Sequence, residues 1–256
     1  MPSVTADDGV EIVYDAWGEP SARPPVVLHH GFIADANLNW VLPGIVSHLT
    51  GRGFQVVAPD ARGHGRSGKP HDPARYGERR MAQDLLALVD EIGAPEVDLV
   101  GYSMGSIVCL IAASQDKRVR RLVVGGVGAG VVELGGVDTR VLDADTLVHA
   151  LEVPGPADLA HPQALAFRMF ADGVGADRRA LAAHARVVHA EPIPLDRITA
   201  PTLVIAGDRD ELAVRPQVLA DAIADARVEL MEGDHLTALN DPRLSRLIAG
   251  FLAQES

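Results

Sequence analysis

The stretch that decides the fold is VDLVGYSMG, residues 97–105. An apolar run typical of a buried strand ends at Gly101, and a segment that is apolar almost all round begins at Met104. A sharp turn from strand to helix pushes its middle residue, Ser103, out of the sheet in a strained backbone conformation. Glycine suits the crowded positions on either side, Gly101 and Gly105. This context favours an exposed serine nucleophile over a purely structural glycine-rich turn.

Short apolar runs alternate with longer helical patterns on both sides of this turn. The predicted strands are Val10–Trp17, Val26–His30, Gln55–Ala58, Val97–Val100, Leu122–Val124, Leu203–Ala206 and Val228–Met231. The first is expected to be an edge hairpin strand, and the continuous apolar runs are typical of strands covered on both faces. The pattern predicts an α/β fold with a mostly parallel, doubly wound sheet of about eight strands and crossover helices.

The alternation stops between the runs Leu122–Val124 and Leu203–Ala206. Residues 132–199 contain no convincing strand and are divided by proline-rich turns, with helices expected over Pro162–Ala171 and Ala176–Ala190. We therefore predict an α/β core from residues 1–131 and 200–256, with a helical lid, or cap, formed by residues 132–199.

Composition excludes several classes of protein. The net charge of the 256 residues is −12, which argues against nucleic acid or an anionic membrane as a partner. A single cysteine, Cys109, excludes a disulfide framework and a cysteine zinc cage, and no metal-ligand spacing is present. No targeting segment or long apolar span is found, so a cytoplasmic location is expected.

A serine nucleophile needs a histidine base, which a carboxylate orients. His235 directly follows the last predicted strand, whereas His184 falls in the helical insertion, where an exposed position is expected. For the acid, Asp208 and Asp210 both follow the strand Leu203–Ala206. Asp210 is favoured because it lies farther into the loop, while an aspartate at the turn itself often binds its own backbone.

The developing oxyanion requires two preorganised N–H donors. One is expected from Met104, directly after the nucleophile, and the other from Phe32, in the loop after the strand Val26–His30. Gly31 allows the chain to approach closely there.

These motifs come in a familiar order. HGF (30–32), PDARGHGRS (59–67), GYSMG (101–105), GDRD (207–210) and GDH (233–235) each follow a predicted strand. In that order the chain resembles the α/β-hydrolase fold family, in its serine hydrolase branch. The resemblance implies a catalytic triad of Ser103, Asp210 and His235, with the backbone N–H groups of Phe32 and Met104 as the oxyanion hole. It also implies a structural role for the loop of residues 59–67.

The resemblance implies a carboxylic-ester hydrolase (EC 3.1.1) acting on small or medium esters through an acyl-enzyme. Ser103 separates the chain from the dehalogenases and epoxide hydrolases of this fold, which carry aspartate at that position. Lactone hydrolysis, C–C bond hydrolysis of diketones and cofactor-free haloperoxidase or perhydrolase activity use the same triad and remain alternatives. A low-turnover ligand-binding relative is a further one. No cofactor or metal is expected, the partner is a small ester or related carbonyl compound, and the sequence does not give the oligomeric state.

Overall fold

The computed structural model describes residues 1–254 and contains an eight-stranded sheet in the order β1-β2-β4-β3-β5-β6-β7-β8. The strands are β1 (Ser3–Thr5), β2 (Glu11–Trp17), β3 (Val26–His29), β4 (Val56–Pro59), β5 (Val97–Tyr102), β6 (Val119–Gly125), β7 (Thr202–Gly207) and β8 (Ala226–Met231). β2 is antiparallel to β1 and to β4, and all other neighbours are parallel. The predicted fold class is confirmed.

The two ends of the sheet differ from the sequence prediction. β1 was not among the predicted strands, because three residues paired with Glu11–Val13 of β2 are too short to form a pattern. β8 was expected to be covered on both faces, and this is wrong. It is the last strand of the sheet, most of its residues are only half-buried or exposed, and Leu230 is 54% exposed.

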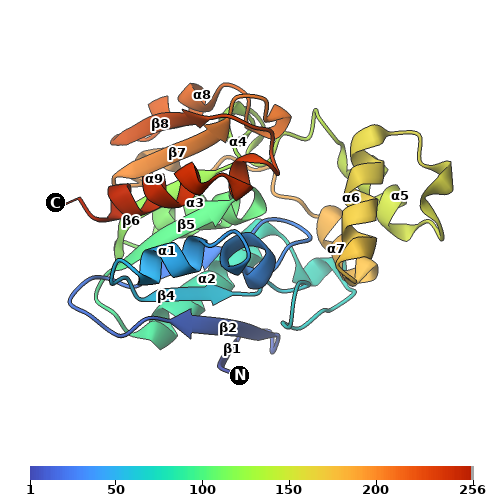
Figure 1. The fold of residues 1–256 in the computed structure, drawn as a ribbon. Helices are drawn as coiled ribbons and strands as arrows, with labels where there is room; N and C mark the ends of the chain where they lie inside the picture. The colour runs from blue at the N-terminus through green and yellow to red at the C-terminus, as the bar shows by residue number, and fades with distance from the viewer. Residues whose placement is uncertain (255–256) are drawn as a thin grey trace.

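Helices cover both faces of the sheet, with α1 and α9 in front and α2 and α3 behind in the view of Figure 1. The core helices are α1 (Ile45–Thr50), α2 (Glu78–Ile92), α3 (Met104–Gln115), α8 (Pro216–Asp221) and α9 (Pro242–Leu252). Successive strand residues point to opposite faces: Leu99 packs in the cluster with α2, α3 and α8, whereas Val100 packs with α1 and α9. The crossover helices therefore produce two separate cores.

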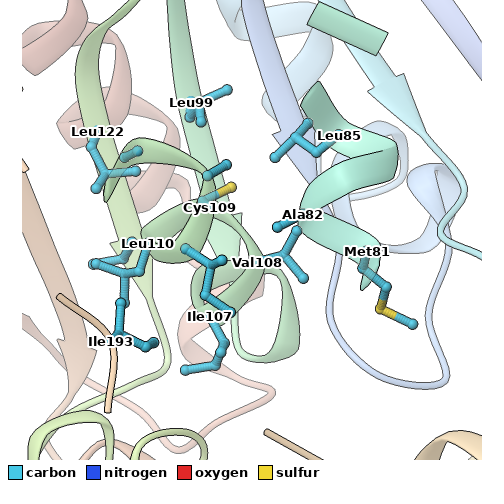
Figure 2. Packing of buried hydrophobic residues seen from close by; sticks show 14 of the residues in the cluster. Met81, Ala82, Leu85, Leu99, Ile107, Val108, Cys109, Leu110, Leu122 and Ile193 are labelled. Carbon is cyan, nitrogen blue, oxygen red and sulfur yellow. The ribbon is translucent and has the colours of Figure 1, made fainter. Parts of the chain in front are cut away.

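The helix that follows Ser103 is the most deeply buried element. Every residue of α3 from Met104 to Ser114 is buried, and Figure 2 shows its side chains between α2 and the strands β5 and β6. Cys109 is fully buried there, and burial raises the pKa of its thiol far above the usual value, as expected for a packing residue. A helix fixed on all sides gives the turn at Ser103 a rigid base.

The segment between β6 and β7 is helical, and residues 126–201 contain no strand. Its elements are α4 (Ala129–Leu134), α5 (Ala144–Glu152), η3 (Pro156–Asp158), α6 (Pro162–Gly173), α7 (Arg178–Ala185) and η4 (Leu195–Arg197). Figure 1 shows α5, α6 and α7 together beyond one end of the sheet. α7 is shorter than predicted, and α5 was not predicted. The division of the chain into a core and a cap stays a prediction.

Four short helical turns lie in the loops around the sheet. They are η1 (Asn37–Val41), η2 (Pro73–Arg75), η5 (Glu211–Ala213) and η6 (Ala238–Asn240). In residues 1–254 no helix combines the length and apolar character needed to cross a lipid bilayer.

Candidate active site

Ser103 occupies a strained turn between β5 and α3. Its backbone has φ 53° and ψ −120°, and only two other non-glycine residues in the described chain have positive φ. The Ser103 N–H donates to the Gly125 carbonyl of β6 at 2.8 Å, which ties the turn to the neighbouring strand. Such strain is typical of functional sites, where the surrounding structure enforces it.

Close packing explains the glycines on both sides of Ser103. A methyl group on Gly105 would overlap the His29 carbonyl group of β3, and one on Gly101 would overlap the Gly105 carbonyl group. α3 therefore begins in direct backbone contact with the sheet. The sequence prediction of crowding at these two positions agrees with this geometry.

Asp210 and His235 are brought together from the loops after β7 and β8. Asp210 Oδ2 lies 2.8 Å from His235 Nδ1, and the Asp210 side chain is buried. The Tyr102 hydroxyl donates to the His235 carbonyl at 2.7 Å, and the two rings are 5.3 Å apart. This contact was not foreseen, because it depends on how the loop after β8 folds over β5. With Nδ1 turned to a carboxylate, His235 keeps its proton there and leaves Nε2 as the basic nitrogen.

Two other aspartates of these loops, Asp208 and Asp234, have backbone partners. Asp208 Oδ1 accepts the N–H of Gly233 at 2.9 Å, which links the two loops that carry the acid and the histidine. Asp234 accepts the Thr237 N–H at 2.8 Å. Of the three, the structure places Asp210 against His235.

The loop after β3 lies directly beside Ser103. A methyl group built on Gly31 would stand 3.3 Å from Ser103 Cβ. His30 Nε2 accepts the Ala61 N–H at 2.8 Å, so the proton is on Nδ1, which donates to the Gly31 carbonyl at 2.8 Å. Because C=O and N–H lie on opposite sides of a trans peptide, the Phe32 N–H points away from His30.

Met104 is the first residue of α3, where a backbone N–H has no acceptor within the helix. The positive end of the helix dipole is at the same place. The two predicted oxyanion donors thus flank Ser103, one at a helix start and one in the loop after β3.

One pocket of about 810 Å³ holds Ser103, Asp210 and His235 together. Its apolar walls come from core loops and from α6, and include Phe32, Leu38, Phe167, Phe170, Leu236 and Leu239. Phe167 and Phe170 of α6 line this pocket, while Met169 between them is 61% exposed. Ser103 makes no hydrogen bond to His235 within residues 1–254, although both line the same space.

Behind Phe32 lies a cluster of buried histidines. His184 of α7 was expected to be exposed, and this is wrong: it is 2% exposed and packs against Phe32 at 5.4 Å and Tyr76 at 5.9 Å between ring centroids. Burial lowers the pKa of His29 to about 3 and holds that of His64 well below its usual value. Both rings are therefore neutral at physiological pH.

The loop of residues 59–67 is held by buried ion pairs. The Arg62 guanidinium is fully buried and contacts Asp84 at 2.6 Å and Asp8 at 2.9 Å. Asp60 accepts the Ala36 N–H at 3.0 Å and pairs with Arg66. These contacts support the structural role inferred for this loop. The described residues hold no cluster of three or more His, Cys, Asp or Glu able to bind a metal ion.

The chain resembles known proteins in sequence and in fold. The family model described as "alpha/beta hydrolase fold" matches residues 24–129, and a hydrolase from Pseudomonas aeruginosa PA01 has the same fold over 99% of this chain and 98% of its own, with 27% identity and a TM-score of 0.76. The described chain therefore has the α/β-hydrolase fold, and residues 24–129 match that family in sequence. This confirms the resemblance that the motifs indicated.

Two curated relatives match only part of the chain. A non-heme haloperoxidase from Rhodococcus erythropolis is 42% identical over 108 residues, which cover 41% of this chain and 35% of that protein. The bifunctional esterase/perhydrolase DCH from Acinetobacter calcoaceticus is 37% identical over 108 residues, which cover 41% of this chain and 36% of that protein. The match thus spans about a third of the length of each relative.

Proposed function

We propose that this protein is a serine esterase that cleaves small or medium carboxylic esters through an acyl-enzyme on Ser103. One observation carries the proposal. The Asp210–His235 pair, joined at 2.8 Å, faces the same pocket as a serine held at φ 53°. A nucleophile, a base and an orienting acid are the three groups that acyl transfer to serine requires.

In the first half of the reaction, Ser103 Oγ attacks the ester carbonyl carbon while His235 Nε2 takes the hydroxyl proton. The carbonyl oxygen becomes an oxyanion, which the N–H groups of Phe32 and Met104 stabilise. The tetrahedral intermediate collapses, the C–O bond to the alcohol breaks, and His235 returns its proton to the leaving alkoxide. The Asp210 side chain orients the imidazole and stabilises the imidazolium form of His235.

In the second half, water replaces the alcohol. His235 Nε2 takes a proton from water as the water oxygen attacks the acyl carbon. The second intermediate then collapses, the bond from the acyl carbon to Ser103 Oγ breaks, and His235 returns the proton to Oγ, which releases the acid and free Ser103. No electron transfer is involved, and no cofactor supplies a group.

The pocket supports an apolar acyl or alcohol group. About 810 Å³ bounded by Phe32, Leu38, Phe167 and Phe170 holds a small or medium ester, with α6 covering it. We therefore treat residues 132–199 as the cap of this site. The expected place of action is the cytoplasm.

Perhydrolysis is the second candidate, favoured by the likeness to a haloperoxidase and to an esterase/perhydrolase. Hydrogen peroxide would then take the place of water in the second half-reaction and yield a peracid from the same acyl-enzyme. A lactone breaks the same acyl C–O bond as an ester but keeps the alcohol attached to the acyl group, whereas a diketone breaks a C–C bond at the acyl carbon and its carbon leaving group takes the proton.

Hydrolysis of a 4-nitrophenyl ester series from acetate to laurate tests the proposal. Turnover is expected to peak at short or medium chains, and Ser103→Ala is expected to lower kcat by about 10⁴-fold or more while leaving the circular dichroism spectrum unchanged. Equal turnover by wild type and Ser103→Ala would show that another group performs the reaction. Adding hydrogen peroxide to the acetate assay and measuring peracetic acid distinguishes the second candidate.

A further inference from the structure

The loop after β3 contains an unusual turn next to the pocket. η1 (Asn37–Val41) is a π-helical turn, in which the Leu42 N–H donates to the Asn37 carbonyl five residues earlier at 2.9 Å. A π-turn adds one residue to a helical turn, and such turns occur frequently at functional sites. Here Trp40 is fully buried in the core, while its neighbour Asn39 lines the pocket of Ser103.

The orientation of the Asn39 amide is fixed by a backbone contact. The Gly31 N–H donates to Asn39 Oδ1 at 2.6 Å, so the oxygen faces Gly31 and the Nδ2 group faces the other way. Within residues 1–254 this Nδ2 group has no hydrogen-bond partner, and it is not sealed from solvent, although the residue as a whole is only 6% exposed. A preorganised donor is therefore open to the pocket.

The same amide lies close to the nucleophile. The position that a Gly31 methyl group would take is 3.6 Å from Asn39 Oδ1 and 3.3 Å from Ser103 Cβ, so both side chains lie against Gly31. The pocket is also lined by the carboxylates of Asp210, Glu211 and Asp234, by Arg209, and by the amides of Gln163 and Asn240. Asn39 differs from these other amides because it is held against Gly31, beside Ser103, and a neutral donor there suits a neutral ester oxygen.

We propose that Asn39 is a further substrate-binding residue of this site. Its Nδ2 group donates a hydrogen bond to an oxygen of the scissile ester, and its Oδ1 accepts the Gly31 N–H, which holds the His30–Gly31 peptide one residue before the Phe32 donor. The inference rests on the proposed esterase function and adds a third donor, from a side chain, to the two backbone N–H groups.

Two substitutions separate these roles. Asn39→Asp keeps an acceptor for the Gly31 N–H but has no donor, whereas Asn39→Leu removes both. Asn37→Asp and Asn37→Leu are matched controls, because Asn37 lies in the same turn, is exposed and lines a different cavity. The measurements are kcat and KM for 4-nitrophenyl butyrate, together with Tm.

Both Asn39 variants are expected to lose at least about tenfold in kcat/KM, because each lacks the donor. Asn39→Asp is expected to keep the wild-type Tm, while Asn39→Leu lowers it, and both Asn37 variants keep wild-type activity. A loss of kcat/KM in Asn39→Leu alone would mean that Asn39 only holds the Gly31 N–H, and this would overturn the proposal. Loss confined to Asn39→Asp would be an effect of added charge and would overturn it equally.

A binding measurement keeps this inference separate from the esterase proposal. In the Ser103→Ala background, calorimetric binding of 4-nitrophenyl butyrate is expected to weaken about three- to tenfold when Asn39→Leu is added, the effect of one neutral hydrogen bond. Unchanged affinity would refute the role of Asn39 even if the wild type is an esterase. Absence of Ser103-dependent turnover, with weakened binding in Asn39→Leu, would refute the esterase alone.

Discussion

At the scale of single residues, the proposed chemistry depends on which nitrogen of His235 carries the proton. Asp210 Oδ2 at 2.8 Å from Nδ1 favours the tautomer in which Nε2 is free to accept the serine proton. Asp210→Asn is expected to lower kcat by about 10²- to 10⁴-fold without unfolding the protein, because an amide no longer enforces that tautomer. Steady-state kinetics on 4-nitrophenyl acetate measures the effect.

Asp208→Asn serves as the control for this substitution. Asp208 lies two residues before Asp210, and its side chain accepts the Gly233 N–H rather than contacting His235. The kcat of Asp208→Asn is therefore expected to stay within a few-fold of the wild-type value. An equal loss in the two variants would mean that the acid has been assigned to the wrong aspartate.

The buried histidines make stability depend on pH. Burial lowers the pKa of His64 well below 6.5, so the unfolded chain binds a proton that the folded chain excludes, and stability falls as the pH drops below about 6.5. Asp98, whose pKa burial raises to about 6, acts in the opposite direction. Substituting one histidine therefore isolates its own contribution to the pH dependence of stability.

The free energy of unfolding in urea at about pH 7 and about pH 5.5 tests this effect. Wild type is expected to lose about 1 kcal/mol more than His64→Asn over that interval. The same loss in both proteins would mean that His64 is protonated in the folded state.

At the scale of elements, the start of α3 tolerates no side chain at Gly105. Gly105→Ala places a methyl group on the His29 carbonyl and is expected to destabilise the protein by about 3 kcal/mol and to displace Ser103. Gly250→Ala, in α9, has nothing within 4 Å of the new methyl group and is expected to stabilise by about 0.5–1 kcal/mol. Urea unfolding of both variants measures the contrast, and a Gly105→Ala protein as stable as wild type would show that α3 can move away from β3.

How well an element could be predicted depended on how local its signal was. The predicted runs within β3 to β7 are buried on both faces and are therefore almost wholly apolar. β1 and α5 were missed because each is short and depends on its neighbours. His184 was misjudged because helical periodicity does not reveal which face of α7 packs against Phe32.

The residues of the candidate site, too, could be predicted only where their sequence signal was local. Ser103, Asp210 and His235 were found from short motifs at strand ends, and the structure brings the acid and the histidine into contact. Asn39 lies in no such motif, and the GYSMG motif that contains Tyr102 does not indicate its contact with His235. Their positions follow from a π-turn and from a loop folding over β5, which only tertiary packing determines.

At the scale of the whole molecule, the pocket lies between α6 and the loops at the end of the sheet. Phe167 of α6 meets Phe32 with ring centroids 6.4 Å apart, so it limits the depth of the pocket. Phe167→Ala is expected to raise the ratio of kcat/KM for decanoate over butyrate esters by at least about fivefold, because it opens space for added methylene groups. Met169→Ala, on the exposed side of the same helix, is expected to leave the ratio unchanged. A shift of equal size in both variants would place the acyl chain elsewhere.

The central claim is that Ser103 is the nucleophile of the pocket that holds Asp210 and His235. The most direct test is reaction with diethyl 4-nitrophenyl phosphate, followed by peptide mass spectrometry. The account predicts loss of esterase activity in step with one diethylphosphoryl group on Ser103, release of one nitrophenolate, and no label in Ser103→Ala. Inactivation with the label on another residue, or labelling of Ser103 that leaves activity intact, would contradict it.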